Sequence, residues 1–149
     1  MKKTYDYALV SGGFDPVHVG HLRMFQDAKN LSENVIVLLN NDEWLIKKKG
    51  KPFMNEDQRK EILEEFKSIS EVIIQKSSDK SSSLAIEEFA KNNPKKRICY
   101  CNGGDRDSIK NIHEAEICKK LGVNLEFGVG GEEKIESSSK LTKNYLGDI

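Results

Sequence analysis

The chain has 149 residues, enough for one domain with its own hydrophobic core, and we expect residues 1–149 to form a single domain. Its 24 lysines and arginines balance 24 aspartates and glutamates, and this zero net charge argues against bulk electrostatic binding of nucleic acid. The N-terminal residues contain neither a signal-peptide core nor a membrane span, so we expect a cytoplasmic protein with no membrane insertion.

Strand-like and helix-like segments alternate along the chain. Apolar runs predict five strands, at Tyr5–Val10, Val35–Leu39, Val72–Gln75, Arg97–Cys101 and Asn124–Gly128. Helical spacing of apolar residues predicts helices at Gly20–Leu31, Asn55–Ile69, Ser82–Lys91, Ile109–Leu121 and Ser137–Leu146. The alternation predicts an α/β fold: a single Rossmann-like, doubly wound domain whose five-stranded parallel sheet is flanked by helices. Ligands of such sheets bind outside the carboxyl ends of the strands, at the switch point, which favours the end of the first strand.

The run from Ser11 to His21 joins the first predicted strand to the first predicted helix. Gly12 and Gly13 have no Cβ, so the backbone can turn sharply there and let a ligand approach its N–H groups. A helix start attracts anions through its unpaired N–H donors and partial positive charge. His18 and His21 are three residues apart, which places both imidazoles on one face of a first helical turn, aimed at one anion. This pattern predicts a phosphate site.

Two alternatives remain open for this run. A Gly-Gly turn after a strand is common in α/β proteins and need bind nothing. A His-x-x-His pair is also half of a metal site, but zinc requires three or four ligands. The third histidine, His113, lies far along the chain and beside no cluster of Cys or His residues, and we expect it to be structural.

The three cysteines, Cys99, Cys101 and Cys118, form no C-x-x-C pair. Cys99 and Cys101 would face the same side of a strand. We interpret all three as small buried hydrophobic residues in a reducing compartment, rather than as a disulfide or a metal set.

The sequence Gly-Gly-Phe-Asp-Pro-Val-His-Val-Gly-His resembles the His-x-Gly-His motif of the nucleotidyltransferase α/β superfamily, which includes glycerol-3-phosphate cytidylyltransferases and heptose-phosphate and phosphopantetheine adenylyltransferases. The resemblance implies transfer of NMP from CTP or ATP to a small phosphorylated acceptor, a sugar or polyol phosphate, with release of pyrophosphate. It also implies Mg²⁺ with the nucleotide and a homodimer. In the motif it assigns catalysis to His18 and His21 and nucleotide binding to Gly12, Gly13, Phe14, Asp15 and Gly20.

A basic segment, Lys47–Lys51, follows the second predicted strand, and we expect it to be a glycine-broken loop. A lysine cluster is usually a solvated charge run; alternatively, a mobile loop of this kind neutralises a triphosphate. In the superfamily a lysine of this loop contacts the nucleotide phosphates. The resemblance favours Lys48 as the catalytic lysine, with Lys49 as a second nucleotide-binding position. We expect Trp44 to be structural.

Arg59 lies on the first turns of a predicted helix and resembles an acidic-x-Arg element of the superfamily, which implies contact with the nucleotide. The alternative is a surface arginine paired along its own helix. Glu56 is then the one carboxylate at suitable spacing, because position 63 is Leu63.

Two further segments match the superfamily. Gly104 and Asp105 follow the fourth predicted strand, where relatives carry Gly-Gly-Asp or Gly-Asp-Asp near the nucleotide; an ordinary turn with an Asx cap is the alternative. Asp15 and Asp105 are the candidate carboxylates near a metal. Ser137, Ser138 and Ser139 open the last predicted helix, where the superfamily binds β- and γ-phosphates, although capping alone explains one serine. The pattern departs from the superfamily at Glu136, which separates Ile135 from the serines.

Two other functions compete with nucleotidyl transfer. A non-catalytic nucleotide-binding module of the same fold is the main alternative, and the retained histidines, lysines and serines argue against it. An oxidoreductase on a Rossmann sheet fits poorly, because the turn is not G-x-G-x-x-G and Asp42 is the only acidic candidate for a ribose contact. The base and the acceptor cannot be read from these residues.

Overall fold

The computed structural model describes residues 3–102, 114–130 and 141. Its strands are β1 (Tyr5–Gly12), β2 (Ser32–Leu39), β3 (Glu71–Ile74), β4 (Ile98–Cys101) and β5 (Asn124–Glu126). Its helices are α1 (Val19–Leu31), α2 (Asp42–Lys49), α3 (Glu56–Glu64), α4 (Ser83–Asn92) and α5 (Ala115–Leu121). The predicted helix at Ser137–Leu146 lies outside the described residues except for residue 141.

The five strands form one sheet in the order β3-β2-β1-β4-β5, and every neighbouring pair is parallel. This confirms the predicted parallel α/β sheet. The chain builds outward from β1 to β3 on one side and then returns to place β4 and β5 on the other. The carboxyl end of β1 is therefore the switch point of the sheet, the position where α/β folds bind ligands.

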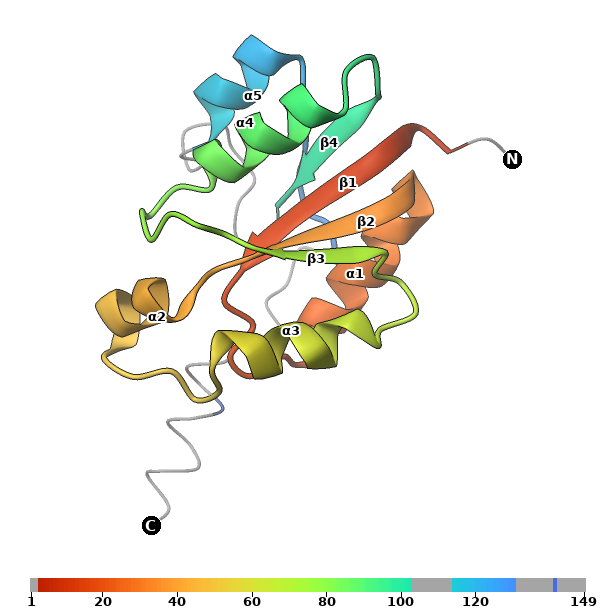
Figure 1. Ribbon diagram of the computed structural model, residues 1–149. Helices are drawn as coiled ribbons and strands as arrows, with labels where there is room; N and C mark the ends of the chain where they lie inside the picture. The colour runs from red at the N-terminus through yellow and green to blue at the C-terminus, as the bar shows by residue number, and fades with distance from the viewer. Residues whose placement is uncertain (1–2, 103–113, 131–140, 142–149) are drawn as a thin grey trace.

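Helices cover both faces of the sheet, with α1 and α3 on one face and α4 and α5 on the other (Figure 1). Because successive residues of a strand point to opposite faces, Val10 joins the core that includes Phe25 of α1, whereas Leu9 joins the core that includes Ile86 of α4. The same alternation divides Val35–Leu39 between the two cores. Burial on both faces explains why that segment is apolar at every position.

The predicted helix at Asn55–Ile69 is shorter in the structure. Asn55 caps α3 as expected, since its side chain accepts a hydrogen bond from the N–H of Gln58, but the helix ends at Glu64. The N–H of Phe66 bonds to the carbonyl of Leu63, three residues back, which ends the regular helix in a tight turn. The apolar stripe continues because the turn buries Ile69 in the same core.

The cysteines match their interpretation as buried hydrophobic residues, and none is in a disulfide. Cys99 and Cys101 lie on the same side of β4, with their sulfurs 3.8 Å apart. The hydrogen bond to Cys101 and then burial raise the pKa of Cys99, and burial raises the pKa of Cys118 to about 12. High thiol pKa values fit inert structural cysteines.

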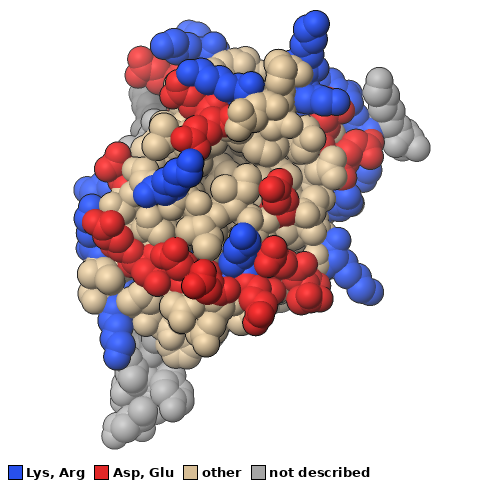
Figure 2. All heavy atoms as spheres, in the orientation of Figure 1, with Lys and Arg blue, Asp and Glu red and all other residues tan. Residues whose placement is uncertain are grey.

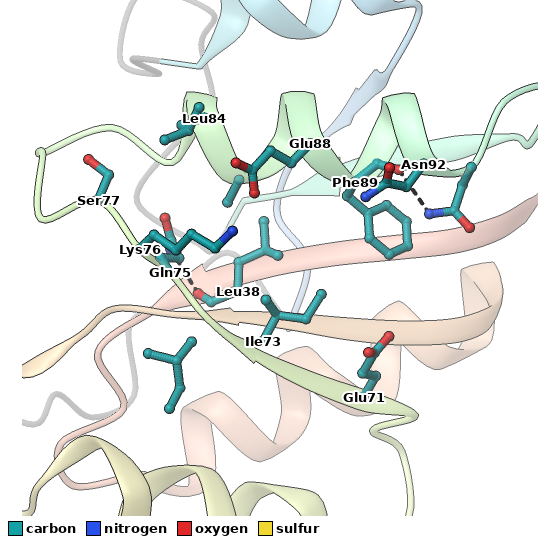
Figure 3. A pocket seen from close by; sticks show the side chains of 13 residues that line it. Leu38, Glu71, Ile73, Gln75, Lys76, Ser77, Leu84, Glu88, Phe89 and Asn92 are labelled. Carbon is teal, nitrogen blue, oxygen red and sulfur yellow. Dashed lines mark hydrogen bonds between the residues drawn. The ribbon is translucent and has the colours of Figure 1, made fainter.

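The face that carries β3 shows how charge is arranged on the surface. Acidic residues form a band over α3, and lysines and arginines lie mainly around the edge of this face (Figure 2). A pocket of about 310 Å³ opens between β3 and α4, with Leu38, Ile73 and Phe89 among its lining residues (Figure 3). It lies on the α4 side of the sheet, opposite α1. Within residues 3–102 and 114–130, no helix combines the length and apolar character that crossing a bilayer requires.

An ion pair joins the start of β1 to Arg97, the residue before β4. The Asp6 carboxylate accepts hydrogen bonds from the Arg97 guanidinium, with a shortest distance of 3.0 Å, and from the Arg97 backbone N–H at 2.8 Å. These bonds lower the pKa of Asp6 to about 2. A depressed carboxyl pKa stabilises the fold above the unfolded pKa of about 4 and loses that contribution as the pH falls toward 2.

We therefore expect Asp6→Asn to flatten the dependence of Tm on pH between about 4 and 2, because the side chain at position 6 no longer takes up a proton in that range. Thermal unfolding at several pH values measures this. Asp79→Asn is the control: Asp79 is exposed, and its carboxylate has no ion pair within the described residues. An Asp6→Asn curve as steep as the parent curve would contradict the expectation.

Candidate active site

The turn between β1 and α1, residues 12–18, which we call the histidine turn, depends on close packing. A Cβ on Gly12 would lie 2.9 Å from the Phe14 ring, and a Cβ on Gly13 would lie 2.9 Å from Cδ2 of Leu45. The positive backbone angle of the turn belongs instead to Phe14, with φ 49°. The approach of a ligand to the N–H groups of Gly12 and Gly13 stays a prediction. The two glycines are needed because the Phe14 ring and α2 approach the backbone closely.

His18 and His21 begin α1. His18 is the N-cap: its Nδ1 accepts a hydrogen bond from the N–H of Gly20 at 3.1 Å. His21 reaches back, and its Nδ1 accepts from the N–H of His18 at 3.2 Å. The two rings stack with centroids 3.7 Å apart and an angle of 21° between their planes. The structure thus brings the predicted pair together, in a capping box in which imidazoles take the usual places of Ser or Thr and Glu or Gln.

This geometry determines which nitrogen of each ring carries the proton. Both Nδ1 atoms accept hydrogen bonds, so a neutral His18 or His21 has its proton on Nε2. Each ring can therefore donate from Nε2 toward an anion. The first turn of α1 contains no acidic residue, so no side-chain carboxylate there opposes the positive end of the helix dipole. The arrangement suits an anionic ligand.

The predicted ligand Asp15 is buried, and both of its carboxylate oxygens bond to protein groups. Oδ1 accepts from the N–H of Met54 at 2.7 Å, and Oδ2 accepts from the N–H of Phe53. The ammonium of Lys49 lies 2.9 Å from Oδ2 and 2.8 Å from the Asp15 carbonyl oxygen. Asp15 thus joins the histidine turn to the segment after α2. Its contact with a nucleotide or a metal stays a prediction, as does that of Lys49.

The prediction of a loop at Lys47–Lys51 was wrong for the first three residues, which form the last turn of α2. Asn41 caps the helix by accepting from the N–H of Trp44 at 2.9 Å, and Gly50 follows the last turn with φ 88°. Acidic residues in the first turn and lysines in the last complement the helix dipole. An Asn cap, this charge order and a final glycine are helix signals that the sequence already contains.

The lysines of α2 point to different partners. Lys47 bonds to the Ser78 hydroxyl at 2.9 Å and lies 3.7 Å from the carboxylate of Glu43. The ammonium of Lys48 lies over the Trp44 ring, 5.1 Å from its centroid. The Trp44 ring approaches the histidine turn, because a Cβ on Gly13 would lie 3.5 Å from its Cζ3. Of the three α2 lysines, Lys48 and Lys49 are connected to that turn.

Arg59 is the largest fully buried side chain among the described residues, with 1% exposure. Its guanidinium donates to the carbonyls of Met54 at 2.9 Å, Gly13 at 2.9 Å and Asn40 at 2.7 Å, and it pairs with Asp42 at 2.8 Å. Pairing along its own helix was therefore the wrong alternative. Arg59 holds the histidine turn, the end of β2 and the start of α3 together. Its direct contact with a nucleotide stays a prediction.

Two acidic residues considered in the sequence have structural partners instead. Glu56 accepts a hydrogen bond from the N–H of Asp42 at 2.9 Å and so supports the start of α2. Asp42 itself pairs with Arg59, which accounts for its place after β2 without a ribose ligand.

A buried polar chain that sequence reasoning missed crosses the carboxyl ends of the strands. The N–H of Asn40 bonds to the Gly12 carbonyl, and the side-chain amide of Gln75 donates to Oδ1 of Asn40 and to the Ser82 hydroxyl. The N–H of Ser82 in turn bonds to Oε1 of Glu114 at 2.8 Å. The available signals were Asn40, directly after a predicted strand, and Gln75, the polar last residue of another. The chain connects the histidine turn to the starts of α4 and α5.

The remaining predicted site residues lie outside the described residues. They are Gly104, Asp105, Ser137, Ser138 and Ser139. Among the described residues, no group of three His, Cys, Asp or Glu side chains is arranged to hold a metal ion.

A parallel sheet with a histidine-capped helix at its switch point defines an α/β protein of the class that binds ligands at the carboxyl ends of its strands. Residues 9–127 match the family model described as cytidylyltransferase-like, and the chain belongs to that family. This confirms the resemblance seen in the motif.

Sequence relatives and a solved structure extend the comparison. The chain is 36% identical over 76 residues to the glycerol-3-phosphate cytidylyltransferase of Bacillus subtilis, covering 51% of this chain and 56% of that protein. It is 35% identical over 74 residues to the FAD synthase of Ferroglobus placidus, covering 50% and 45%. The chain thus spans about half the length of the curated relatives it matches. A bifunctional NMN adenylyltransferase/ADP ribose pyrophosphatase from Francisella tularensis, complexed with AMP and a manganese ion, shares the fold with a TM-score of 0.64 and 17% identity over 97% of this chain and 42% of that one.

Arg59 gives a direct test of how the turn is held. Arg59→Met should lower the free energy of unfolding by about 3–5 kcal/mol, because it leaves Asp42 and three carbonyl oxygens without their donor. Arg59→Lys should cost about 1–3 kcal/mol, because one ammonium cannot reach every acceptor of the planar guanidinium. Urea denaturation measures both. Arg23→Met, at an exposed position of α1, should stay within about 0.5 kcal/mol of the parent; equal effects at the two positions would contradict the assignment.

Proposed function

We propose that this protein is a nucleotidyltransferase that transfers NMP from CTP or ATP to a small phosphorylated acceptor and releases pyrophosphate. The observation that carries the proposal is the stacked His18–His21 pair at the start of α1, whose Nδ1 atoms accept hydrogen bonds, so that the proton of each neutral ring is on Nε2, the atom we propose as the donor to a phosphate. Family membership and the named activities of the relatives support it.

In the proposed reaction, an oxygen of the acceptor phosphate attacks the α-phosphorus of the nucleotide in line, and the bond from that phosphorus to the pyrophosphate oxygen breaks. The acceptor phosphate is already ionised at neutral pH, so no strong general base is required. The protein positions the reactants and neutralises charge. His18 and His21 donate hydrogen bonds to the triphosphate and to its transition state, and Lys48 or Lys49 neutralises the departing pyrophosphate.

A divalent cation is part of this proposal. The manganese ion in the Francisella tularensis protein supports divalent metal use, and Mg²⁺ is the ion we propose here. In the proposal the ion arrives with the nucleotide and neutralises its triphosphate. Asp15 and Asp105 remain the candidate carboxylates beside it, and Asp15 would have to exchange protein donors for the ion.

The acceptor, the oligomer and the location are the finer parts of the proposal. The two relatives suggest CTP with glycerol 3-phosphate, and ATP with FMN, of which FAD is the adenylylated form, as the first pairs to assay. We also propose a single-domain homodimer in the cytoplasm, and sedimentation equilibrium tests the dimer.

The first prediction concerns the histidines. His21→Ala should lower kcat by about 10²–10³-fold, the usual cost of removing one preorganised donor to a transition state. His21→Gln is the matched control for the helix start, because Gln can replace the acceptor of the capping box but has no imidazole. It should keep the parent Tm and still lose activity. A pyrophosphate-release assay measures kcat, and near-normal turnover by either variant would refute the assignment.

The second prediction concerns the metal and the acceptor. Pyrophosphate release should require both an added divalent cation and a phosphorylated acceptor, and EDTA should abolish it. A screen of four NTPs against a panel of acceptor phosphates measures this dependence. A rate unaffected by EDTA would exclude the metal role. Calorimetric binding of a nucleotide without turnover on any acceptor would favour a non-catalytic nucleotide-binding module.

A further inference from the structure

Glu114, the residue before α5, has a buried carboxylate that the proposed reaction does not use. Its side chain belongs to a residue with 3% exposure, and Oε1 accepts a hydrogen bond at 2.8 Å from the N–H of Ser82, the N-cap of α4. Among the described residues, Oε2 is the one buried side-chain oxygen or nitrogen without a hydrogen-bond partner. A buried carboxylate oxygen without a donor is costly, so this atom calls for an explanation in terms of function.

Glu114 lies at the carboxyl edge of the sheet, across the switch point from the histidine turn. The neighbouring strands β1 and β4 are followed by α1 on one face and by α5 on the other (Figure 1). The crevice in which such sheets bind nucleotides therefore lies between the starts of α1 and α5. The polar chain that begins at the Gly12 carbonyl and runs through Asn40, Gln75 and Ser82 ends at Glu114. A nucleotide with its phosphates at α1 extends across this crevice toward Glu114.

The two sides of the crevice differ in charge. The first turn of α1 has no acidic residue, so the start of that helix attracts phosphate. The first turn of α4 has none either, but the carboxylate of Glu114 already bonds to its N-cap N–H. This side therefore repels phosphate and suits a neutral group that donates hydrogen bonds. The acceptor of the proposed reaction carries an ionised phosphate, whereas a nucleotide base is neutral, and this difference favours the base as the occupant.

We propose that Oε2 of Glu114 accepts a hydrogen bond from the exocyclic amino group of the nucleotide base. Cytosine and adenine both carry this group, whereas uracil and hypoxanthine carry a carbonyl oxygen in its place, which a carboxylate repels. The inference rests on the proposed function and deepens it, because it explains a choice of CTP or ATP over UTP or ITP. Since Oε2 is enclosed, the base reaches it only when the starts of α4 and α5 move apart, as in induced-fit recognition.

Calorimetry with Mg²⁺ tests the inference by comparing CTP with UTP and ATP with ITP. The parent should bind at least one amino-base nucleotide about 10- to 100-fold more tightly than its keto partner, the range for a hydrogen bond to a charged group. Glu114→Gln should abolish or reverse this preference, because its amide oxygen still accepts from Ser82 while its NH₂ group donates where Oε2 accepted. The variant should not have a lower Tm, since it keeps the Ser82 contact and removes a buried charge.

Two further variants separate base recognition from general effects. Glu116→Gln removes an exposed carboxylate from the first turn of α5 and should leave the preference unchanged. Glu114→Met should lose the preference as well, and it carries the test if Glu114→Gln does not fold. The preference of the parent itself is measured without any variant.

Equal affinity of the parent for the amino and keto partners would overturn the inference and leave the proposed function standing. A preference that survives in Glu114→Gln would do the same, as would a loss confined to the KM of the phosphorylated acceptor. If the parent binds none of the four nucleotides, the proposed function fails, and the inference fails with it.

Discussion

The rest of the site depends on the hydrogen bonds that the buried guanidinium of Arg59 donates. A buried cation is costly unless acceptors surround it, and here backbone carbonyls supply most of them. Those carbonyls belong to three separate segments: the histidine turn, the end of β2 and the start of α3. Since one rigid, planar group bonds to all three, their relative positions are fixed before any ligand arrives. Preorganisation of this kind is what a site that works by positioning requires.

At the start of α1, one pair of side chains serves both folding and chemistry. The Nδ1 atoms of His18 and His21 satisfy backbone donors that every helix N-terminus leaves open. This use of Nδ1 sets the tautomer in which Nε2 carries the proton. A serine cap has a single oxygen, whereas an imidazole combines the capping acceptor with a second nitrogen that donates. The capping geometry therefore prepares the proposed phosphate contacts.

Charge near the turn is distributed by pairing. Asp15 takes the ammonium of Lys49 together with two backbone N–H groups, so this pair mainly joins the turn to the segment after α2. The ammonium of Lys48 lies over the Trp44 ring. Three consecutive lysines thus have three different environments, which their shared sequence context cannot reveal. The chemical roles of neighbouring lysines follow from their partners rather than from their order.

The sequence by itself determined the parallel sheet, the start of α1 and the family, because these depend on local patterns: apolar runs, helical spacing and a contiguous motif. It also contained the signals for α2, which the lysine run obscured. Only the tertiary structure decided the roles of Gly13 and Arg59. The space beside Gly13 is occupied by Leu45 and Trp44, and the acceptors of Arg59 come from segments distant in sequence. Contacts of this kind exist only after the strands have been assembled side by side, so no local pattern encodes them.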